Sequence, residues 1–256
     1  MKPLKKSVVS SKPISYNKLT KTHAGLVILR RFQNIIARKN LLPRGSKLIV
    51  AVSGGPDSMM LLALLDRLRS KHDFTLRVAH VNYGLRGHES DQDEKIVEQY
   101  CNANNIPFSV LRTKMKPSKN IEQTLRTVRY AWFERLRQKY RYDAIVTAHT
   151  MNDLAETVLL NLIRGSGLSG LSPFQRTHSH LLRPLIFFTR ADIETFLEAE
   201  HISFRIDQSN FSKKFTRNRV RHELIPLLKT FNPSIIQTLA KTATVLGEKE
   251  ASSKPE

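Results

Sequence analysis

Segment 53–58 combines the residue types that bind nucleotide phosphates: Ser53, Gly54, Gly55, Pro56, Asp57 and Ser58. Two glycines let the main chain turn sharply and approach an anion with no Cβ in the way. The segment lies between an apolar, strand-like run at 47–52 and a helical run at 59–68, whose first turn offers N–H groups and the positive end of the helix dipole. The sequence therefore predicts a phosphate loop between a strand and a helix. A serine- and glycine-rich turn that only caps the helix is the weaker alternative.

The spacing within this loop excludes the common nucleoside-triphosphatase motif. That motif, GxxxxGK[ST], places a Lys beside the β and γ phosphates, and no such spacing occurs in the chain. The Ser-Gly-Gly-x-Asp-Ser form instead resembles the PP-loop of enzymes that split ATP between its α and β phosphates. The resemblance implies adenylation, in which AMP is transferred and then displaced.

A second polar motif follows the apolar run at 143–148. His149 ends this predicted strand, and Asp153 and Glu156 lie in the first turns of the next predicted helix. Residues three or four apart share a helix face, so both acids can face one cleft, although Asp153 could equally cap the helix. Because ATP-dependent chemistry uses Mg²⁺ with oxygen ligands, we expect Asp57 and Asp153 to hold Mg²⁺, directly or through water.

Strands and helices alternate regularly along the middle of the chain. We expect strands at 47–52, 74–81, 108–112 and 143–148, separated by helices near 59–68, 89–104 and 121–140, with a further helix at 152–164. Parallel neighbours need crossover connections, and both faces of the sheet must be covered, so the pattern predicts an α/β fold with a doubly wound parallel sheet. Ligands in such sheets bind beyond the carboxyl ends of the strands, where the phosphate loop, His80 to Tyr83 and Thr147 to His149 all fall.

The flanking segments define the expected domain organisation. Residues 1–22 form a basic disordered arm, because they are rich in Lys, Ser and Thr and lack periodicity, and a basic amphipathic helix is expected at 24–41. The catalytic domain is expected over 23–210. Its later part comprises a substrate loop near 165–180, an extended stretch at 181–185, a helix at 189–201 and a short strand near 203–206. A basic helical extension at 211–246 and a loose polar tail at 247–256 complete the chain.

Composition and charge restrict the class of protein. The chain has 256 residues, 40% of them hydrophobic, enough for one generous domain. Its net charge is +20, and no Asp or Glu precedes Asp57. Nucleic acid is therefore the leading partner, an acidic membrane surface the lesser one, and solubility alone the third explanation.

Cysteine content and hydropathy point to a compartment. The single Cys101 excludes an intramolecular disulfide and a CxxC redox pair, and no apolar run is long enough to span a bilayer. We expect a reducing, cytoplasmic environment and no membrane association. If the protein forms an oligomer, we expect a homodimer. Arm 1–22 could instead be an organelle-targeting segment, although it lacks the Arg typical of transit peptides.

The longer motifs carry a more specific resemblance. Their order is that of the tRNA(Ile)-lysidine synthetases over roughly residues 26–230: after the PP-loop come His80 to Glu94 (HVNYGLRGHESDQDE), Arg126 to Tyr130, Thr147 to Thr157, Asn161 to Gly170, Arg183 to Leu185 and Asp207 to Pro226. The resemblance implies an enzyme that binds ATP and Mg²⁺ and adenylates the C2 oxygen of the wobble cytidine in a tRNA(Ile) with a CAU anticodon. The ε-amine of free L-lysine then attacks C2 and displaces AMP, which gives lysidine.

Individual residues take their expected roles from this resemblance. The loop residues would hold the phosphates, while Arg129, His149, Asp153 and Arg217 would be catalytic or contact AMP. The residue types agree: Arg129 is a permanent planar cation suited to an α-phosphate, and His149 can donate to a phosphate oxygen or shuttle a proton. Glu156 could pair with the ammonium of lysine, and Arg217 could alternatively reach RNA phosphate. The acids between residues 89 and 94 are expected only to stabilise the first turn of their helix.

Two other functions compete with this interpretation. Another PP-loop enzyme that modifies tRNA, such as a cytidine thiolase, would want cysteine pairs that the sequence lacks. A catalytically silent RNA-binding protein with a PP-loop fold is the second, and the complete set of Asp57, Arg129, His149 and Asp153 argues against it. Many lysidine synthetases continue into a further C-terminal region that grips tRNA, and we expect the basic segment before Asp57 to substitute for it here.

Overall fold

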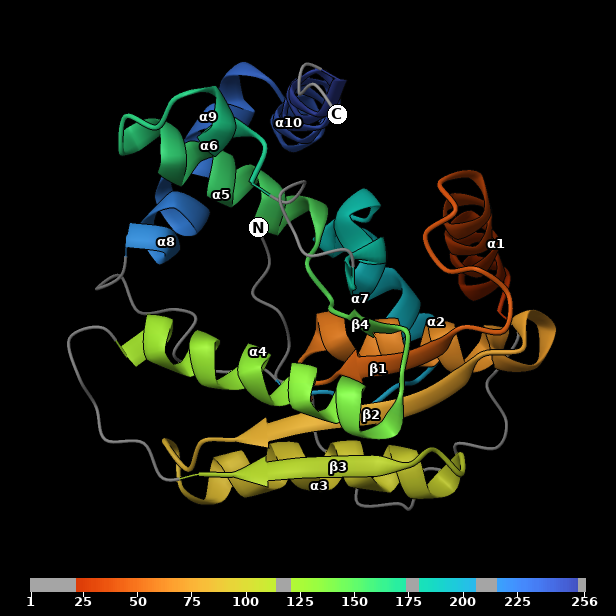
Figure 1. Ribbon diagram of the computed structural model, residues 1–256. Helices are drawn as coiled ribbons and strands as arrows, with labels where there is room; N and C mark the ends of the chain where they lie inside the picture. Colours follow the sequence, from red (N-terminus) through yellow and green to blue (C-terminus); the bar gives the residue numbers. More distant parts are fainter. Residues whose placement is uncertain (1–21, 114–120, 174–179, 206–215, 253–256) are drawn as a thin grey trace.

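The computed structural model describes residues 22–113, 121–173, 180–205 and 216–252 (Figure 1). The predictions made for the basic arm and for the last residues of the tail, 253–256, lie outside this part of the chain. So do residues 206–215, which include the predicted boundary between the catalytic domain and the basic extension.

A parallel sheet of five strands lies at the centre of the molecule. Its spatial order is β3 (Phe108–Arg112), β2 (Thr75–Asn82), β1 (Lys47–Ala51), β4 (Ala144–Val146) and β5 (Leu181–Leu182), and every neighbouring pair is parallel. The chain therefore adds β2 and β3 on one side of β1 and then β4 and β5 on the other side. This confirms the predicted doubly wound sheet, and it places the reversal of strand order between β1 and β4, where such folds bind ligands.

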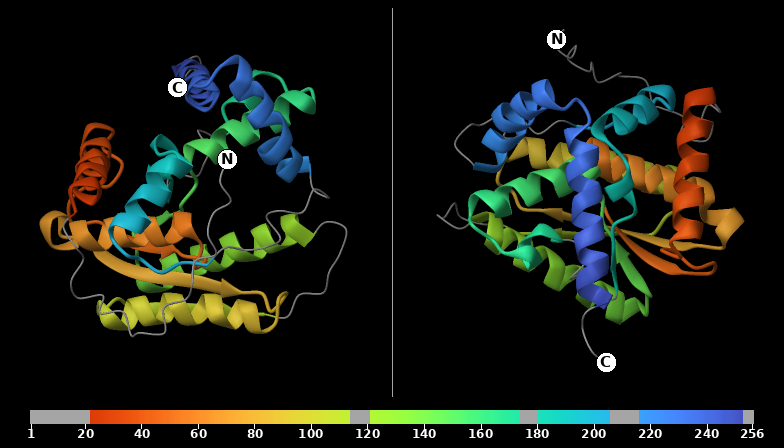
Figure 2. Two further views of the ribbon diagram at one scale, coloured as in Figure 1. Left: turned by 180° about the vertical axis from the view of Figure 1, so that it is seen from behind. Right: turned by 90° about the horizontal axis from the view of Figure 1, so that it is seen from above.

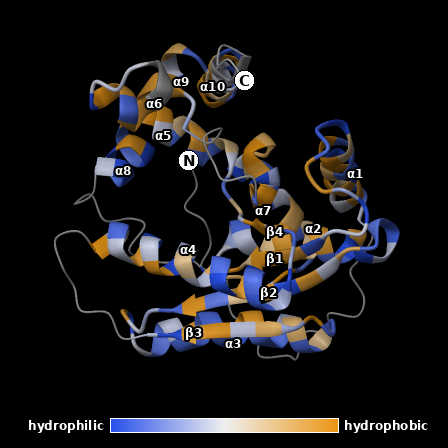
Figure 3. Cartoon of the chain, in the orientation of Figure 1, coloured by the Kyte–Doolittle hydropathy of each residue, from blue (hydrophilic) through white to orange (hydrophobic). Residues whose placement is uncertain are grey.

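Alternation along the strands directs apolar side chains to both faces of the sheet. Leu48 and Val50 pack on one face and Ile49 on the other. Figure 3 shows hydrophobic residues along the central strands and α2, as expected for a sheet covered on both sides. The first face is covered by α1 (His23–Arg38), α2 (Pro56–His72), α3 (His88–Ala103) and α7 (Arg190–Ala199), and the second by α4 (Ile121–Tyr140).

The remaining helices form a lobe beside the layered part of the molecule, as Figures 1 and 2 show. This helical lobe comprises α5 (Met151–Ile163), α6 (Leu168–Leu171), α8 (Thr216–Arg219), a π-helical turn (Val220–Leu224), α9 (Ile225–Phe231) and α10 (Ile235–Ser252). Leu154 and Val158 of α5 are buried against Ala240 and Ala243 of α10. Since α5 directly follows β4, this packing fixes the C-terminal helices relative to the sheet.

The structure corrects two predicted segments. The short strand predicted near 203–206 is wrong for residues 203–205, because the Arg205 N–H donates to the Gly54 carbonyl, 3.0 Å away, rather than to a strand. The loose tail predicted from Gly247 is wrong for residues 247–252, which extend α10.

Two other segments differ in detail from their predictions. The extended stretch at 181–185 contributes only two residues to the sheet before a 3-10 turn, Pro184–Phe187, begins. The basic helix predicted at 216–229 is present but is interrupted by the π-helical turn. Pro226 lacks the N–H that would continue the helical ladder at this point, which favours irregular hydrogen bonding. No helix in the described ranges is long and apolar enough to cross a membrane.

Candidate active site

The loop after β1 closes on itself through hydrogen bonds of its serines. Ser58 Oγ accepts from the Ser53 N–H at 3.1 Å and donates to the Gly55 carbonyl at 2.9 Å. Pro56 is the first residue of α2, where its missing N–H costs nothing and its fixed φ suits the helix. The loop therefore sits at the N-terminal end of a 17-residue helix, with the positive end of the helix dipole facing it.

Gly54 is the position in this loop that requires glycine. Its φ is +87°, in the left-handed region, and a Cβ there would lie 3.1 Å from the Asp93 carbonyl oxygen. Any side chain would strain the turn and push it away from α3. The predicted sharp turn is confirmed at this residue. The close main-chain approach seen here is to Asp93, and the approach to an anion stays a prediction.

Asp57 supplies the carboxylate of the loop, and this carboxylate lies in an unusual environment. Its Oδ1 atom is buried and makes no hydrogen bond. Burial, and next the negative charge of Asp153, raise the pKa of Asp57 to about 6, and the opposing effect of Arg190 and Arg221 is smaller. A buried carboxylate oxygen without a partner, beside a second carboxylate, fits a cation ligand.

Asp153 uses its two oxygens for different purposes. Oδ2 accepts hydrogen bonds from the Thr150 N–H at 2.9 Å and from Thr150 Oγ1 at 3.0 Å, which completes a capping box at the start of α5. Oδ1 lies 3.4 Å from Arg217 Nη2 and 3.5 Å from Arg221 Nη2. Burial opposes ionisation of Asp153, but His149, Arg217, the Thr150 N–H and Arg221 outweigh it and lower the pKa of Asp153. The helix cap, one of the two predicted roles, is therefore confirmed, and the role in a site stays a prediction.

The number of carboxylates indicates which metal ion the site could hold. The described residues contain no group of three or more His, Cys, Asp or Glu able to hold a metal ion. A closed, all-protein cage is therefore not seen in this part of the chain. Two carboxylates that influence each other electrostatically fit Mg²⁺, which commonly binds through one or two carboxylates, several waters and substrate phosphates.

Glu156 ties the C-terminal segment to α5. It is 1% exposed, and its carboxylate accepts hydrogen bonds from Arg221 Nε at 2.5 Å, Arg221 Nη2 at 2.8 Å and Arg217 Nε at 3.0 Å. The hypothesis that Glu156 pairs with the ammonium of free lysine is wrong for this arrangement, because two guanidinium groups already neutralise it. Arg217, predicted as a site residue, thus reaches both Asp153 and Glu156.

His149 is neutral at physiological pH. Burial is the largest cause, and repulsion by Arg183, Arg126 and Arg129 adds to it, so that the pKa of His149 falls to about 3 despite the attraction of Asp153. Its Nδ1 lies 3.0 Å from Thr147 Oγ1. The imidazole is therefore an uncharged polar group amid three guanidinium groups, an environment that favours a bound anion.

Arg129 approaches this environment from α4. It donates a hydrogen bond to the Tyr83 hydroxyl, beyond the end of β2, and it interacts electrostatically with His149. Arg126, one helical turn earlier, and Arg183, directly after β5, act on the same histidine, and neither was predicted as a site residue. The i, i+3 spacing on α4 and the strand-end position of Arg183 were the signals that could have identified them.

The predicted site residues thus form one connected group. Asp57, Asp153 and His149 influence one another electrostatically, Arg217 contacts Asp153, and Arg129 acts on His149. Asp57, Arg129, Asp153 and Arg217 come from α2, α4, α5 and α8, and His149 lies between β4 and α5.

The chain is similar to known proteins over most of its length. The family model described as a PP-loop domain matches residues 26–228. The tRNA(Ile)-lysidine synthase of Clostridium tetani is 38% identical over 213 residues, which are 80% of this chain and 46% of that protein. The enzyme of the same name from Chlorobaculum tepidum is 37% identical over 227 residues, 86% of this chain and 69% of that protein. The chain spans about half the length of the first relatives that it matches.

A solved structure supports the fold. The U34-tRNA thiolase NcsA from Methanococcus maripaludis, determined with its [4Fe-4S] cluster, superposes with a TM-score of 0.72 and covers 88% of this chain and 80% of its own. At 16% sequence identity this likeness concerns the fold alone.

Proposed function

The chain belongs to the tRNA(Ile)-lysidine synthase family of PP-loop proteins, which use ATP, and from this premise we propose that it joins free L-lysine to a tRNA(Ile) with a CAU anticodon. In the first step the C2 oxygen of the wobble cytidine attacks the α-phosphate of ATP and pyrophosphate leaves. In the second step the ε-amine of lysine attacks C2, loses a proton, and AMP leaves with the oxygen.

The observation that carries the proposal is the convergence of Asp57 and Asp153 beside a loop of the adenylation type. We propose that the loop and the N-terminal turn of α2 hold the phosphates released as pyrophosphate. Asp57 and Asp153 would hold Mg²⁺, which supplies charge neutralisation when bound.

Three further residues are proposed to act on the α-phosphate and AMP. Arg129 offers a planar, permanently charged donor, and its electrostatic interaction with His149 supports a location near the reacting phosphate. Neutral His149 would supply a hydrogen bond to a phosphate oxygen without adding charge. Arg217 would help to position AMP while it neutralises Asp153 and Glu156.

A specific observation weakens the thiolase alternative. Cys101 lies within the hydrophobic core, and burial, followed by the negative charge of Asp66, raises the pKa of its thiol to about 12. A buried, protonated thiol is a poor nucleophile and a poor metal ligand. Sulfur transfer therefore gains no support from the described residues.

The partners follow from the proposed reaction. A net charge of +20 favours tRNA as a polyanionic substrate, and free lysine is the second substrate. Cytoplasmic location and a homodimer stay predictions that accompany this proposal.

The direct test is incubation with ATP, Mg²⁺, lysine and a tRNA transcript that bears CAU, followed by mass analysis of the nucleosides. The expected product is cytidine plus lysine minus water, with pyrophosphate release that depends on the tRNA. A transcript with uridine at the wobble position is the matched control and is expected to remain unmodified. RNA binding without pyrophosphate release would instead indicate the silent RNA-binding protein, and pyrophosphate release without incorporation of lysine would indicate a different tRNA modification.

A further inference from the structure

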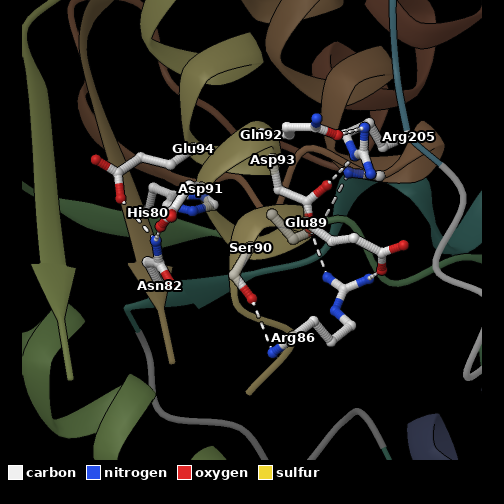
Figure 4. Close-up of polar contacts among 12 residues, drawn as sticks. His80, Asn82, Arg86, Glu89, Ser90, Asp91, Gln92, Asp93, Glu94 and Arg205 are labelled. Atoms are coloured by element: carbon white, nitrogen blue, oxygen red, sulfur yellow. Dashed lines mark hydrogen bonds and ion pairs between the residues drawn. The ribbon is translucent and has the colours of Figure 1, made fainter. Parts of the chain in front are cut away.

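Asp93 of α3 lies between two guanidinium groups, one from the turn before this helix and one from a distant part of the chain. Asp93 Oδ2 lies 2.5 Å from Arg86 Nη2, and Asp93 Oδ1 lies 2.7 Å from Arg205 Nε. Figure 4 shows the Asp93 carboxylate pointing toward both arginines, with Gln92 accepting a further hydrogen bond from Arg205. Asp93 is only 7% exposed, so the pairing takes place largely out of water. The prediction that this acid only stabilises the first turn of α3 is therefore wrong.

This group contacts the phosphate loop directly. The Arg205 N–H donates to the Gly54 carbonyl at 3.0 Å, and Gly54 approaches the main chain of Asp93 so closely that a Cβ would lie 3.1 Å from the Asp93 oxygen. Gly54 is thus held between α3 and residue 205. It is also the residue whose left-handed conformation makes the loop turn.

We propose that Arg86, Asp93 and Arg205 act as a loop clamp, in which Asp93 and Arg205 are positioning residues that hold the phosphate loop in its ATP-binding conformation. The inference rests on the proposed function only in taking ATP as the ligand of the loop. The Asp93 carboxylate fixes the Arg205 side chain, and the Arg205 main chain in turn holds Gly54. Loop N–H groups that are already oriented bind phosphate without a further ordering cost.

The neighbouring acid on α3 provides a matched control. Glu94 pairs with Arg112, whose Nη2 lies 2.5 Å from Glu94 Oε1, and it accepts a hydrogen bond from Asn82 at 2.9 Å. This ion pair has the same chemistry, and its acid lies on the same helix as Asp93, while Arg112 belongs to β3. No contact of the described residues joins it to Gly54, so breaking it should leave the loop in place.

The test compares Asp93→Asn, Arg205→Gln and Arg112→Gln by calorimetric titration with ATP and Mg²⁺. We expect the Kd for ATP to rise about tenfold in each clamp variant and to change less than about twofold in Arg112→Gln. The double variant Asp93→Asn/Arg205→Gln should bind ATP about as weakly as either single variant, since both remove the same interaction. Arg205→Lys, which keeps a cation beside Asp93, should restore part of the affinity.

Other outcomes would overturn the inference. Unchanged ATP affinity in Arg205→Gln, with only a lower melting temperature, would show a purely structural ion pair, as would fully additive effects in the double variant. If Asp93→Asn fails to fold, the two Arg205 variants decide, because both keep the main-chain N–H. A wild-type chain that binds ATP but makes no lysidine would refute the proposed function and leave this test valid, whereas a chain that does not bind ATP would refute both.

Discussion

At the scale of single residues, the buried carboxylate of Asp57 opposes folding when it is ionised. Its pKa is raised from the ordinary value of 3.8 to about 6, so the folded protein binds this proton more tightly than the unfolded chain does. The resulting stabilisation is fully present below pH 3.8 and is lost as the pH rises through about 6.

Replacing Asp57 by Asn should therefore stabilise the metal-free protein at high pH while it abolishes ATP-dependent activity. We expect the free energy of unfolding of Asp57→Asn to exceed that of wild type by about 2 kcal/mol at pH 8 in EDTA. At pH 4 the two free energies should differ little. Denaturant unfolding at both pH values measures this effect. Asp73→Asn, at the exposed end of the same helix, removes the same charge from a position outside the loop and is the control. A stability difference that is the same at pH 4 and pH 8 would contradict the assignment.

The candidate site residues are predictable from local sequence, but the contacts of each carboxylate are not. Asp57 and Asp153 were found because glycine-rich turns and helix starts have local signatures. Glu156 pairs with Arg217 and Arg221, and Asp93 pairs with Arg205 as well as with the nearby Arg86. Apart from Arg86, these partners lie at least 60 positions away in the sequence. Pairing of this kind depends on tertiary packing, and no local pattern encodes it.

At the scale of elements, one buried ion-pair network joins α5 to the C-terminal segment. Glu156→Gln would leave Arg221, whose side chain is 16% exposed, without its principal counter-charge. We expect this variant to lose about 2–4 kcal/mol of unfolding free energy in denaturant titrations. The exposed pair of Arg219 and Glu223 in the same segment is the control, and Glu223→Gln should cost less than about 0.5 kcal/mol. Equal losses in the two variants would count against the network.

Apolar packing supplies the second connection between these elements. Leu154 is 4% exposed and packs against α10, whereas Leu162 on the same helix is 49% exposed. Leu154→Ala should therefore cost about 2–4 kcal/mol and Leu162→Ala less than about 1 kcal/mol. Thermal and denaturant unfolding check both values. A small effect at Leu154 would show that α10 packs loosely on α5.

The elements themselves were largely predictable where hydrophobic periodicity was strong. The strands at β1, β2 and β3 and the helices between them are in their predicted places, because buried strands and amphipathic helices leave clear patterns. The short strand predicted near 203–206 is wrong at residues 203–205. Phe204 and Ile206 suit a strand, but the Arg205 N–H donates to the phosphate loop instead of to a neighbouring strand. The loose tail predicted from Gly247 is wrong up to Ser252, because polar residues at the end of a helix show little hydrophobic periodicity.

At the scale of the whole molecule, the positive charge is concentrated before the phosphate loop, and α1 presents part of it to solvent. Val27, Arg30, Arg31, Asn34 and Arg38 of this helix are exposed to solvent. Arg31 is partly neutralised, since its Nη1 lies 2.9 Å from Asp192 Oδ1, while Arg30 and Arg38 are exposed. Exposed cations on one face bind RNA phosphates and release counterions, so their contribution should depend on salt.

The double variant Arg30→Gln/Arg38→Gln tests whether α1 contacts tRNA. If both arginines bind phosphates, the slope of log K against log salt should become shallower by roughly 1–2, with weaker tRNA binding at low salt. Filter binding of a CAU transcript over a salt series measures the slope. Affinity for ATP should not change, because α1 packs on α7 and α2 away from the loop. Lys95→Gln/Lys139→Gln removes the same charge from exposed positions on α3 and α4 and should leave the slope unaltered. Equal changes in the two double variants would contradict this prediction. The affinity for tRNA would then depend on the net charge of the protein and not on the position of the charges on α1.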